Sequence, residues 1–144
     1  MIGIRTTIKT ALVNTLKATP GVSMVFPSKP REERAQQFPA LYIAIEKTND
    51  TRVFAKRHIT FTVTVYVNVI DPDPNEMAAQ QRFDDLLDAI DAQLRSDPTL
   101  GGAVLHAAEK YIDTVVAEPF LAGNGLSVTL NAAKSFEVYA EINA

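Results

Sequence analysis

A strict two-residue alternation between residues 57 and 70 constrains the fold of this chain more than any other feature. One face of this segment carries Ile59, Phe61, Val63, Val65, Val67 and Val69, and the other carries His58, Thr60, Thr62, Thr64, Tyr66 and Asn68. A period of two with β-branched residues on both faces predicts a half-buried strand. At about 3.3 Å per residue, this strand extends for roughly 40 Å.

Apolar residues at helical spacing predict two helices. In residues 3–18 they recur every fourth position, at Ile4, Ile8, Leu12 and Leu16, and Pro20-Gly21 ends the helix. The second helix runs to about Arg95 and buries a stripe made of Phe83, Leu86, Leu87, Ile90 and Leu94. Capping chemistry predicts its start, with Asp73 as the N-cap, Pro74 as the first helical residue and Glu76 as the acid of a capping box.

Further strands are predicted from alternation and from the turn residues between them. They span residues 22–26, 40–47, 111–117 and 126–142. We expect Pro119 to end the third of these and Gly123-Asn124-Gly125 to form a turn. The last strand is expected to bend or break around residues 131–134, because its length is unusual for one strand. Residues 28–38 and 48–55 are expected to be polar surface loops, and residues 103–108 fit a short helix or a turn.

The predicted order of elements is α-β-β-β-α-β-β. Consecutive strands favour an α+β fold, with an antiparallel or mixed sheet and two main helices packed on one face. We expect one domain that covers residues 1–144. Its core should bring Phe61, Val63 and Val65 under the second helix. No segment has the length of apolar sequence that a signal peptide or a membrane span requires, so we expect no membrane association.

The residues available for chemistry are few. The chain has no cysteine and two histidines, His58 and His106, which removes thiolate and disulfide chemistry and leaves little for imidazole sites. Asp71, Asp73 and Asn75 have the spacing of the first ligands of a calcium loop, but Glu76 and Arg82 stand where that loop needs glycine and glutamate. Helix capping explains the same residues. We therefore expect no catalytic residue, no cofactor and no metal.

The charges are divided unevenly along the chain. Residues 1–70 carry ten Lys or Arg and four Asp or Glu, whereas residues 71–144 carry four and thirteen. This is either an ordinary scatter of surface charge or a molecule with a basic face and an acidic face, which can bind copies of itself head to tail. In the second interpretation the candidate contact residues are Lys29, Arg31, Arg34, Arg52, Lys56, Arg57, Asp84, Asp88 and Asp91. The aspartates also fit a solvated helix face, and a catalytic pair is the least supported alternative.

Several motifs, taken in order, resemble a known family. They are the opening helix with Thr19-Pro20-Gly21-Val22, the segment Phe38-Pro39-Ala40-Leu41-Tyr42-Ile43, the charged loop through Arg52 into the long strand, the helix end from Leu94 to Gly102, and the closing strand from Phe136 to Ile142. Together they cover nearly the whole chain. In this order they resemble the tail terminator, or tail completion, proteins of long-tailed bacteriophages.

This resemblance implies a structural protein of the virion. Members of the family form a homo-oligomeric ring, usually a hexamer, at the junction of tail and neck. The ring caps the tail tube protein, ends its polymerisation and offers its other side to the head–tail connector protein, while DNA passes through the lumen without being read. Assembly takes place in the host cytoplasm. Three alternatives stay open: another neck or tail protein such as a head–tail joining protein, a small-ligand binding module, and an enzyme.

Overall fold

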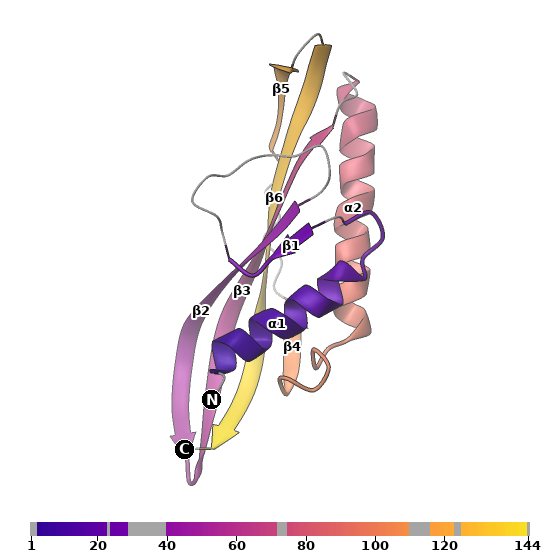
Figure 1. Cartoon of the computed structure of the whole chain (residues 1–144). Coiled ribbons are helices and arrows are strands. Elements are labelled where there is room, and N and C mark those ends of the chain that lie inside the picture. The colour runs from indigo at the N-terminus through magenta and orange to yellow at the C-terminus, as the bar shows by residue number, and fades with distance from the viewer. Residues whose placement is uncertain are drawn as a thin grey trace.

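A computed structural model describes the backbone of residues 3–22, 24–28, 40–71, 75–109, 116–122 and 125–143. Side chains are described over the same ranges, except at residues 76, 106–109, 116–122, 125–129 and 143. The elements are α1 (Ile4–Lys17), β1 (Met24–Phe26), β2 (Ala40–Val53), β3 (Lys56–Asp71), α2 (Glu76–Ser96), β4 (His106–Glu109), β5 (Val116–Ala122) and β6 (Gly125–Asn143) (Figure 1). The predicted α+β class and element order are confirmed, with the short strand β4 added.

The described strands form one mixed sheet in the order β1-β2-β3-β6-β4, and β5 pairs with β6. The β1–β2 pair is parallel, and every other pair is antiparallel. The central strand β3 pairs along its whole length with β6, from Lys56 opposite Asn143 to Asp71 opposite Val128. The strict alternation of β3 therefore sets the two faces of the entire sheet.

Both helices cover the same face of the sheet. The odd-numbered residues of β3 from Ile59 to Val69 are all buried, and they join one core with Leu12 of α1 and Phe83 of α2. The even-numbered residues of β3 from Thr60 to Ile70 are only half-buried on the opposite, open face. The predicted burial of Phe61, Val63 and Val65 and the packing of two amphipathic helices on one face are confirmed, because each element has an apolar face that water would otherwise contact.

Three predicted element boundaries were wrong. The N-cap of α2 is Asn75, whose side-chain oxygen accepts hydrogen bonds from the backbone N–H groups of Met77 and Ala78. The cap predicted for Asp73 is thus supplied by Asn75, and Glu76 is the first helical residue instead of the third. Asp73 and Pro74 themselves lie outside the described residues. Pro119 lies within β5 opposite Val128, where an edge strand tolerates a residue without a backbone donor. Residues 48–53 belong to β2 instead of a loop, after a register irregularity between Lys47 and Asn49.

The expected break in the last strand is absent, and β6 is continuous from Gly125 to Asn143. Lys134, at the end of the segment where a bend or break was expected, points into the core from a register otherwise occupied by apolar residues. Its ammonium group bonds the Asp91 carboxylate on α2, with Nζ and Oδ1 2.7 Å apart. A partner on the helix therefore allows a charged residue to continue the buried face of the strand.

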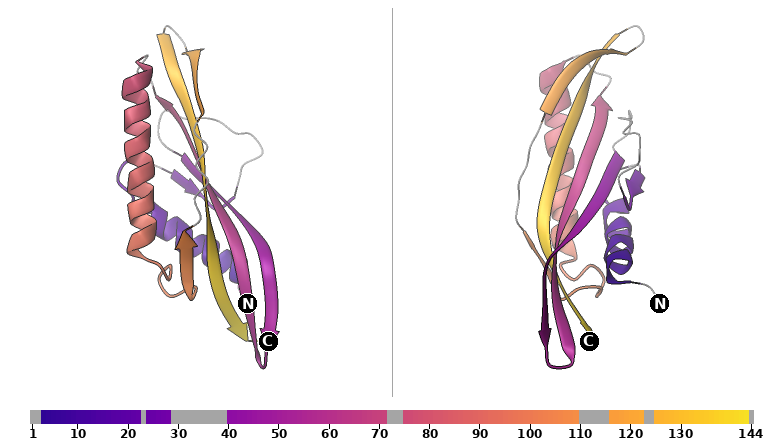
Figure 2. Two further views of the ribbon diagram at one scale, coloured as in Figure 1. Left: turned by 180° about the vertical axis from the view of Figure 1, so that it is seen from behind. Right: turned by 90° about the vertical axis from the view of Figure 1, so that its left-hand side faces the viewer.

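Beyond Ile59 and Ala140, the sheet extends past both helices as a three-stranded arm. We define this arm as residues 47–58 of the β2–β3 hairpin together with residues 141–143 of β6 (Figure 2). The side chains of residues 47–56 are all exposed. The arm is consequently held by its backbone pairing and its surface contacts and not by the core.

We expect Val65→Asp to lower the free energy of unfolding by more than about 3 kcal/mol, because it buries an unpaired carboxylate at a position with no exposed surface. Asn68→Asp is the control, since it places the same charge on the open face of the same strand. Urea denaturation measures both. Equal stability of the two variants would show that the face of β3 has been assigned wrongly.

Candidate functional site

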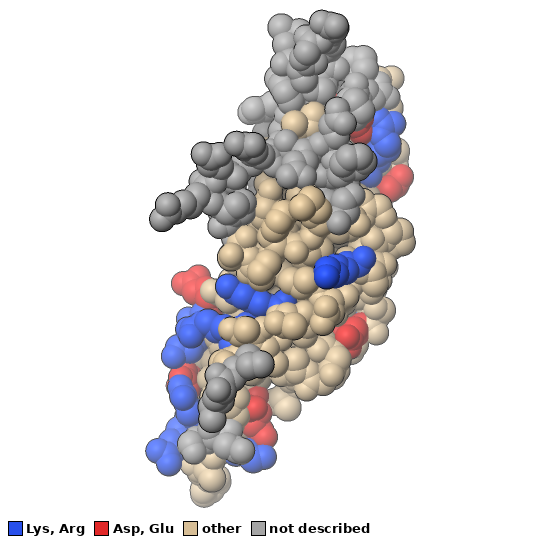
Figure 3. Space-filling view, viewed as in Figure 1, with Lys and Arg blue, Asp and Glu red and all other residues tan. Residues whose placement is uncertain are grey.

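The basic and acidic candidate residues lie on different elements. Lys29, Arg31 and Arg34 lie outside the described residues. The remaining basic candidates, Arg52, Lys56 and Arg57, all lie on the arm, where Figure 3 shows Lys and Arg gathered with a few acidic residues between them. The candidate acids Asp84, Asp88 and Asp91 lie on α2. The described basic candidates from the first half of the sequence therefore lie on the arm, and the acidic candidates from the second half lie on α2.

Most charged groups of the arm have partners within the chain. Asp50 accepts hydrogen bonds from Arg57, whose Nε lies 3.1 Å from Oδ1 and whose second nitrogen contacts Oδ2, and from Lys47 Nζ at 3.2 Å. The bond from Arg57 is the main reason that the pKa of Asp50 lies below its ordinary value. The same pair raises the pKa of Arg57. These groups are exposed, so the pair sets the geometry of the hairpin more than its stability.

A second cluster joins the hairpin to the end of β6. Glu141 accepts hydrogen bonds from Lys56 Nζ at 2.8 Å and from His58 Nε2 at 2.9 Å. The bond from Lys56, followed by that from His58, lowers the pKa of Glu141. Lys56 and Arg57 are thus engaged inside their own chain. Arg52 differs, because the described residues provide no carboxylate within ion-pair distance of its guanidinium group.

The tip of the arm is apolar, which the sequence analysis missed. Val53 pairs with Lys56, so Phe54 and Ala55 form a two-residue turn. Phe54 is 94% exposed and has a φ of 55°, a conformation for which glycine is the usual residue. A side chain there costs about 1–2 kcal/mol. Arg52 Nε donates a 3.2 Å hydrogen bond to the Phe54 carbonyl oxygen and holds the turn. The sequence signal that could have identified this tip is Phe54, a single aromatic residue inside a polar stretch.

The three candidate aspartates of α2 are not equivalent. Asp84 and Asp88 are exposed on its outer face, with Asp85 beside them. Asp91 instead turns toward the sheet and bonds Lys134, whose side chain is 1% exposed. Because its carboxylate already neutralises a buried cation, Asp91 belongs to the core of this chain. Lys134 is the second residue that the sequence analysis missed, since it was considered only as the end of the segment where the long strand was expected to bend or break.

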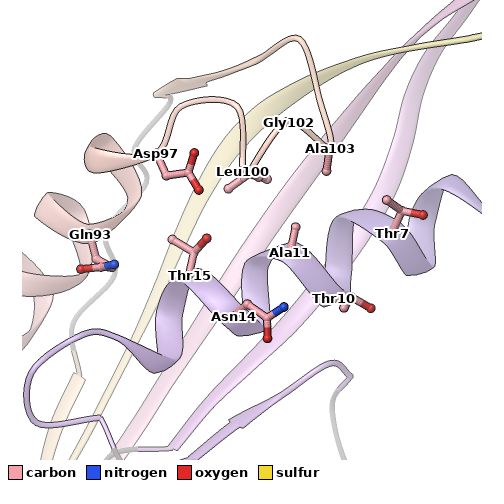
Figure 4. A pocket seen from close by; sticks show the side chains of 11 residues that line it. Thr7, Thr10, Ala11, Asn14, Thr15, Gln93, Asp97, Leu100, Gly102 and Ala103 are labelled. Atoms are coloured by element: carbon pink, nitrogen blue, oxygen red, sulfur yellow. The ribbon is translucent and has the colours of Figure 1, made fainter.

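One hollow lies between α1 and the turns that follow α2. It has a volume of about 680 Å³, and Figure 4 shows Thr15 and Ala11 of α1 beneath Leu100 and the Asp97 carboxylate. Six of its eleven lining residues are polar: Thr7, Thr10, Asn14, Thr15, Gln93 and Asp97. Leu100 and the two glycines that follow it have positive φ values, which close the turn. Among the described residues that line this hollow, Asp97 is the one charged residue.

A second hollow lies beside the N-terminal half of α2. Its volume is about 440 Å³, and its wall is mainly apolar, from Pro20, Val69, Ala79, Phe83, Leu86, Ala89 and Leu130. Asp71, Arg82 and Asp85 add polar groups to the lining. Arg82 holds Asp71 through two hydrogen bonds of 2.8 Å. We call this the apolar hollow, and its lining fits an apolar side chain with charged groups around it.

The open face of the sheet carries hydroxyl groups that bond one another. Thr64 Oγ1 and Ser135 Oγ are 3.0 Å apart, and the Tyr139 hydroxyl donates to Glu137 Oε2 at 2.7 Å. The Glu137 bond is the main cause of the raised pKa of Tyr139.

Within the described ranges no group of three or more His, Asp or Glu residues has a metal-binding arrangement. Neither described helix combines the length and the apolar character needed to cross a bilayer.

Comparison with known proteins identifies no relative: no family model matches the chain, and no curated protein matches it. The proposed function therefore rests on the geometry and the sequence of this chain.

We expect Asp91→Ala to lower the free energy of unfolding by about 3–5 kcal/mol, because it leaves the Lys134 ammonium buried without its carboxylate. Asp88→Ala is the matched control, since it removes an exposed aspartate of the same helix and should change stability by less than about 0.5 kcal/mol. Chemical denaturation of both variants tests the difference. A mild Asp91→Ala variant would mean that the ion pair stabilises nothing.

We expect Arg57→Gln to raise the pKa of Asp50 toward its ordinary value of 3.8, because the hydrogen bond that lowers it is lost. A lowered carboxyl pKa adds stability above the ordinary value, and that contribution disappears as the pH falls through the lowered pKa. NMR titration of the Asp50 carboxyl carbon measures the change, with Arg52→Gln as the control. If the titration is the same in wild type and Arg57→Gln, the pair does not exist in solution.

Proposed function

We propose that this protein is a structural subunit of virion assembly, a tail terminator of a long-tailed bacteriophage. Copies of the chain form a ring that sits on the finished tail tube, ends its growth and offers its other side to the head–tail connector. The proposal starts from the resemblance of the sequence motifs to this family. The observation that carries it furthest is the separation between a basic arm and an acidic helix face in one molecule.

Such a separation suits contact between identical subunits. In a closed ring of more than two copies, one surface of each subunit contacts a different surface of the next. The arm carries four Lys or Arg, one Asp and one Glu, whereas the outer face of α2 carries Asp84, Asp85 and Asp88. Exposed pairs contribute only about 0–1 kcal/mol each, so the charges guide the register while apolar contacts hold the ring.

Termination follows from a difference between the two sides of the ring. One side binds the growing end of the tube protein, and the other lacks the surface to which a further tube subunit would bind. The second side then remains available to the connector. DNA passes through the lumen without specific recognition, and this role requires no catalytic group, cofactor or metal.

We expect the purified protein to form rings, by sedimentation and electron microscopy, that dissociate as salt concentration rises because salt screens exposed charges. Arg52→Glu should weaken assembly and lengthen tails, since Arg52 has no carboxylate partner within the described part of its own chain. Lys9→Glu on α1 changes the net charge equally, away from the arm, and is the control. A monomer at every concentration, with tails of normal length in the absence of the protein, would contradict the proposal.

A further inference from the structure

The exposed aromatic residue at the tip of the arm points to a contact more specific than charge attraction. Phe54 is 94% exposed, occupies a backbone conformation that favours glycine and is held there by the hydrogen bond from Arg52. Val53 beside it is also exposed. Neither the exposed ring nor the strained turn stabilises the free subunit, and an aromatic side chain held in this way has the character of an interface anchor.

We propose that Phe54 is an anchor residue that inserts into the apolar hollow of a second copy of this chain. The hollow has a volume of about 440 Å³ and presents Phe83, Leu86 and Val69. An apolar cavity of about 150 Å³ is enough to bind a benzene ring, so a phenyl group fits within it. Aromatic anchors that fill pockets dominate the energy of many protein interfaces.

Phe54 cannot reach the hollow of its own chain. The tip joins the first residue of β3, Lys56, whereas Asp71 at the other end of β3 lines the hollow. At about 3.4 Å per residue, the two ends are separated by roughly 50 Å. Figure 1 shows the same separation, with the β2–β3 turn at one end of the molecule and the N-terminal half of α2 toward the other. The contact is therefore between molecules. In the proposed ring it is heterologous, so it repeats from one copy to the next.

Charge complementarity selects a second copy as the occupant. Arg52 lies two residues before Phe54 in the sequence and has no carboxylate partner among the described residues, so its charge is available to a neighbouring molecule. The hollow has Asp85 in its lining, and the exposed Asp84 and Asp88 extend the acidic surface along α2. The larger hollow beside α1 is a poorer acceptor, because a phenyl ring there would cover the polar side chains of Thr10, Asn14 and Gln93.

This contact deepens the proposed ring assembly and rests on self-association of the chain. The first measurement compares wild type with Phe54→Gly by analytical ultracentrifugation. Glycine removes the anchor and suits the positive φ, so the variant should fold at least as stably as wild type. Its self-association should nevertheless weaken by about thirtyfold or more. Phe54→Tyr retains the ring and should assemble nearly as well as wild type.

The second measurement blocks the acceptor and then mixes two variants. Ala89→Trp fills the apolar hollow, whereas Thr10→Trp fills the larger hollow and is the matched control. Ala89→Trp alone should be monomeric, and Thr10→Trp should assemble. An equimolar mixture of Phe54→Gly and Ala89→Trp should give a dimer and nothing larger, because one variant supplies an intact anchor and the other an intact hollow.

The possible results test the Phe54 contact and the proposed ring separately. If wild type assembles but Phe54→Gly assembles equally well, the anchor is wrong while the ring proposal stands. If Phe54→Gly is monomeric and its mixture with Ala89→Trp gives no dimer, Phe54 binds another surface or another protein, and the assigned hollow is wrong. A wild type that stays monomeric at every concentration overturns both proposals. Assembly of wild type, loss in both single variants and recovery as a dimer in the mixture supports the contact.

Discussion

A mismatch between strand length and helix length organises this molecule. A strand advances about 3.4 Å per residue and a helix 1.5 Å, so the 16 residues of β3 span more distance than the 21 residues of α2. The helices consequently cover only part of one face of the sheet. Burial along β3 begins at Ile59, and the pairing of β2, β3 and β6 continues beyond it. The uncovered end is the arm, which carries the exposed side chains of the candidate assembly surface.

An ion pair within the apolar core fixes the register of α2 on the sheet. Lys134 continues the buried register of β6, and Asp91 supplies the compensating charge from the helix. A buried pair of this kind contributes little net energy compared with apolar residues, but it makes other registers costly, because each of them would bury one charge alone. The register matters for function, since it also fixes where Asp84 and Asp88 meet solvent and where the apolar hollow opens.

The candidate surface combines features that a free subunit does not need. Phe54 is held in solvent by a turn that suits glycine, and the apolar hollow lies at the far end of the same strand. The charged groups around the tip are largely paired within the chain, through Asp50 and Glu141. These pairs fix the geometry of the arm, and the arm in turn holds its apolar tip in position. In the proposed ring, shape and apolar contact hold neighbours together, while unpaired charge guides their approach.

The sequence by itself determined the local structure, because that depends on neighbours along the chain. The alternation of residues 57–70 identified β3 and its buried face, helical spacing identified α1 and α2, and their order indicated the α+β class. Only the tertiary structure decided contacts between distant segments. The length of the last strand suggested a bend or break near Lys134, and only the structure shows that Asp91, 43 positions away, neutralises this buried lysine. Residues 48–53 looked like a loop because their exposed polar side chains carry no burial pattern, and backbone pairing alone makes them a strand. The role of Phe54 required both the turn that exposes it and the hollow at the opposite end of β3, and no local pattern contains that relation.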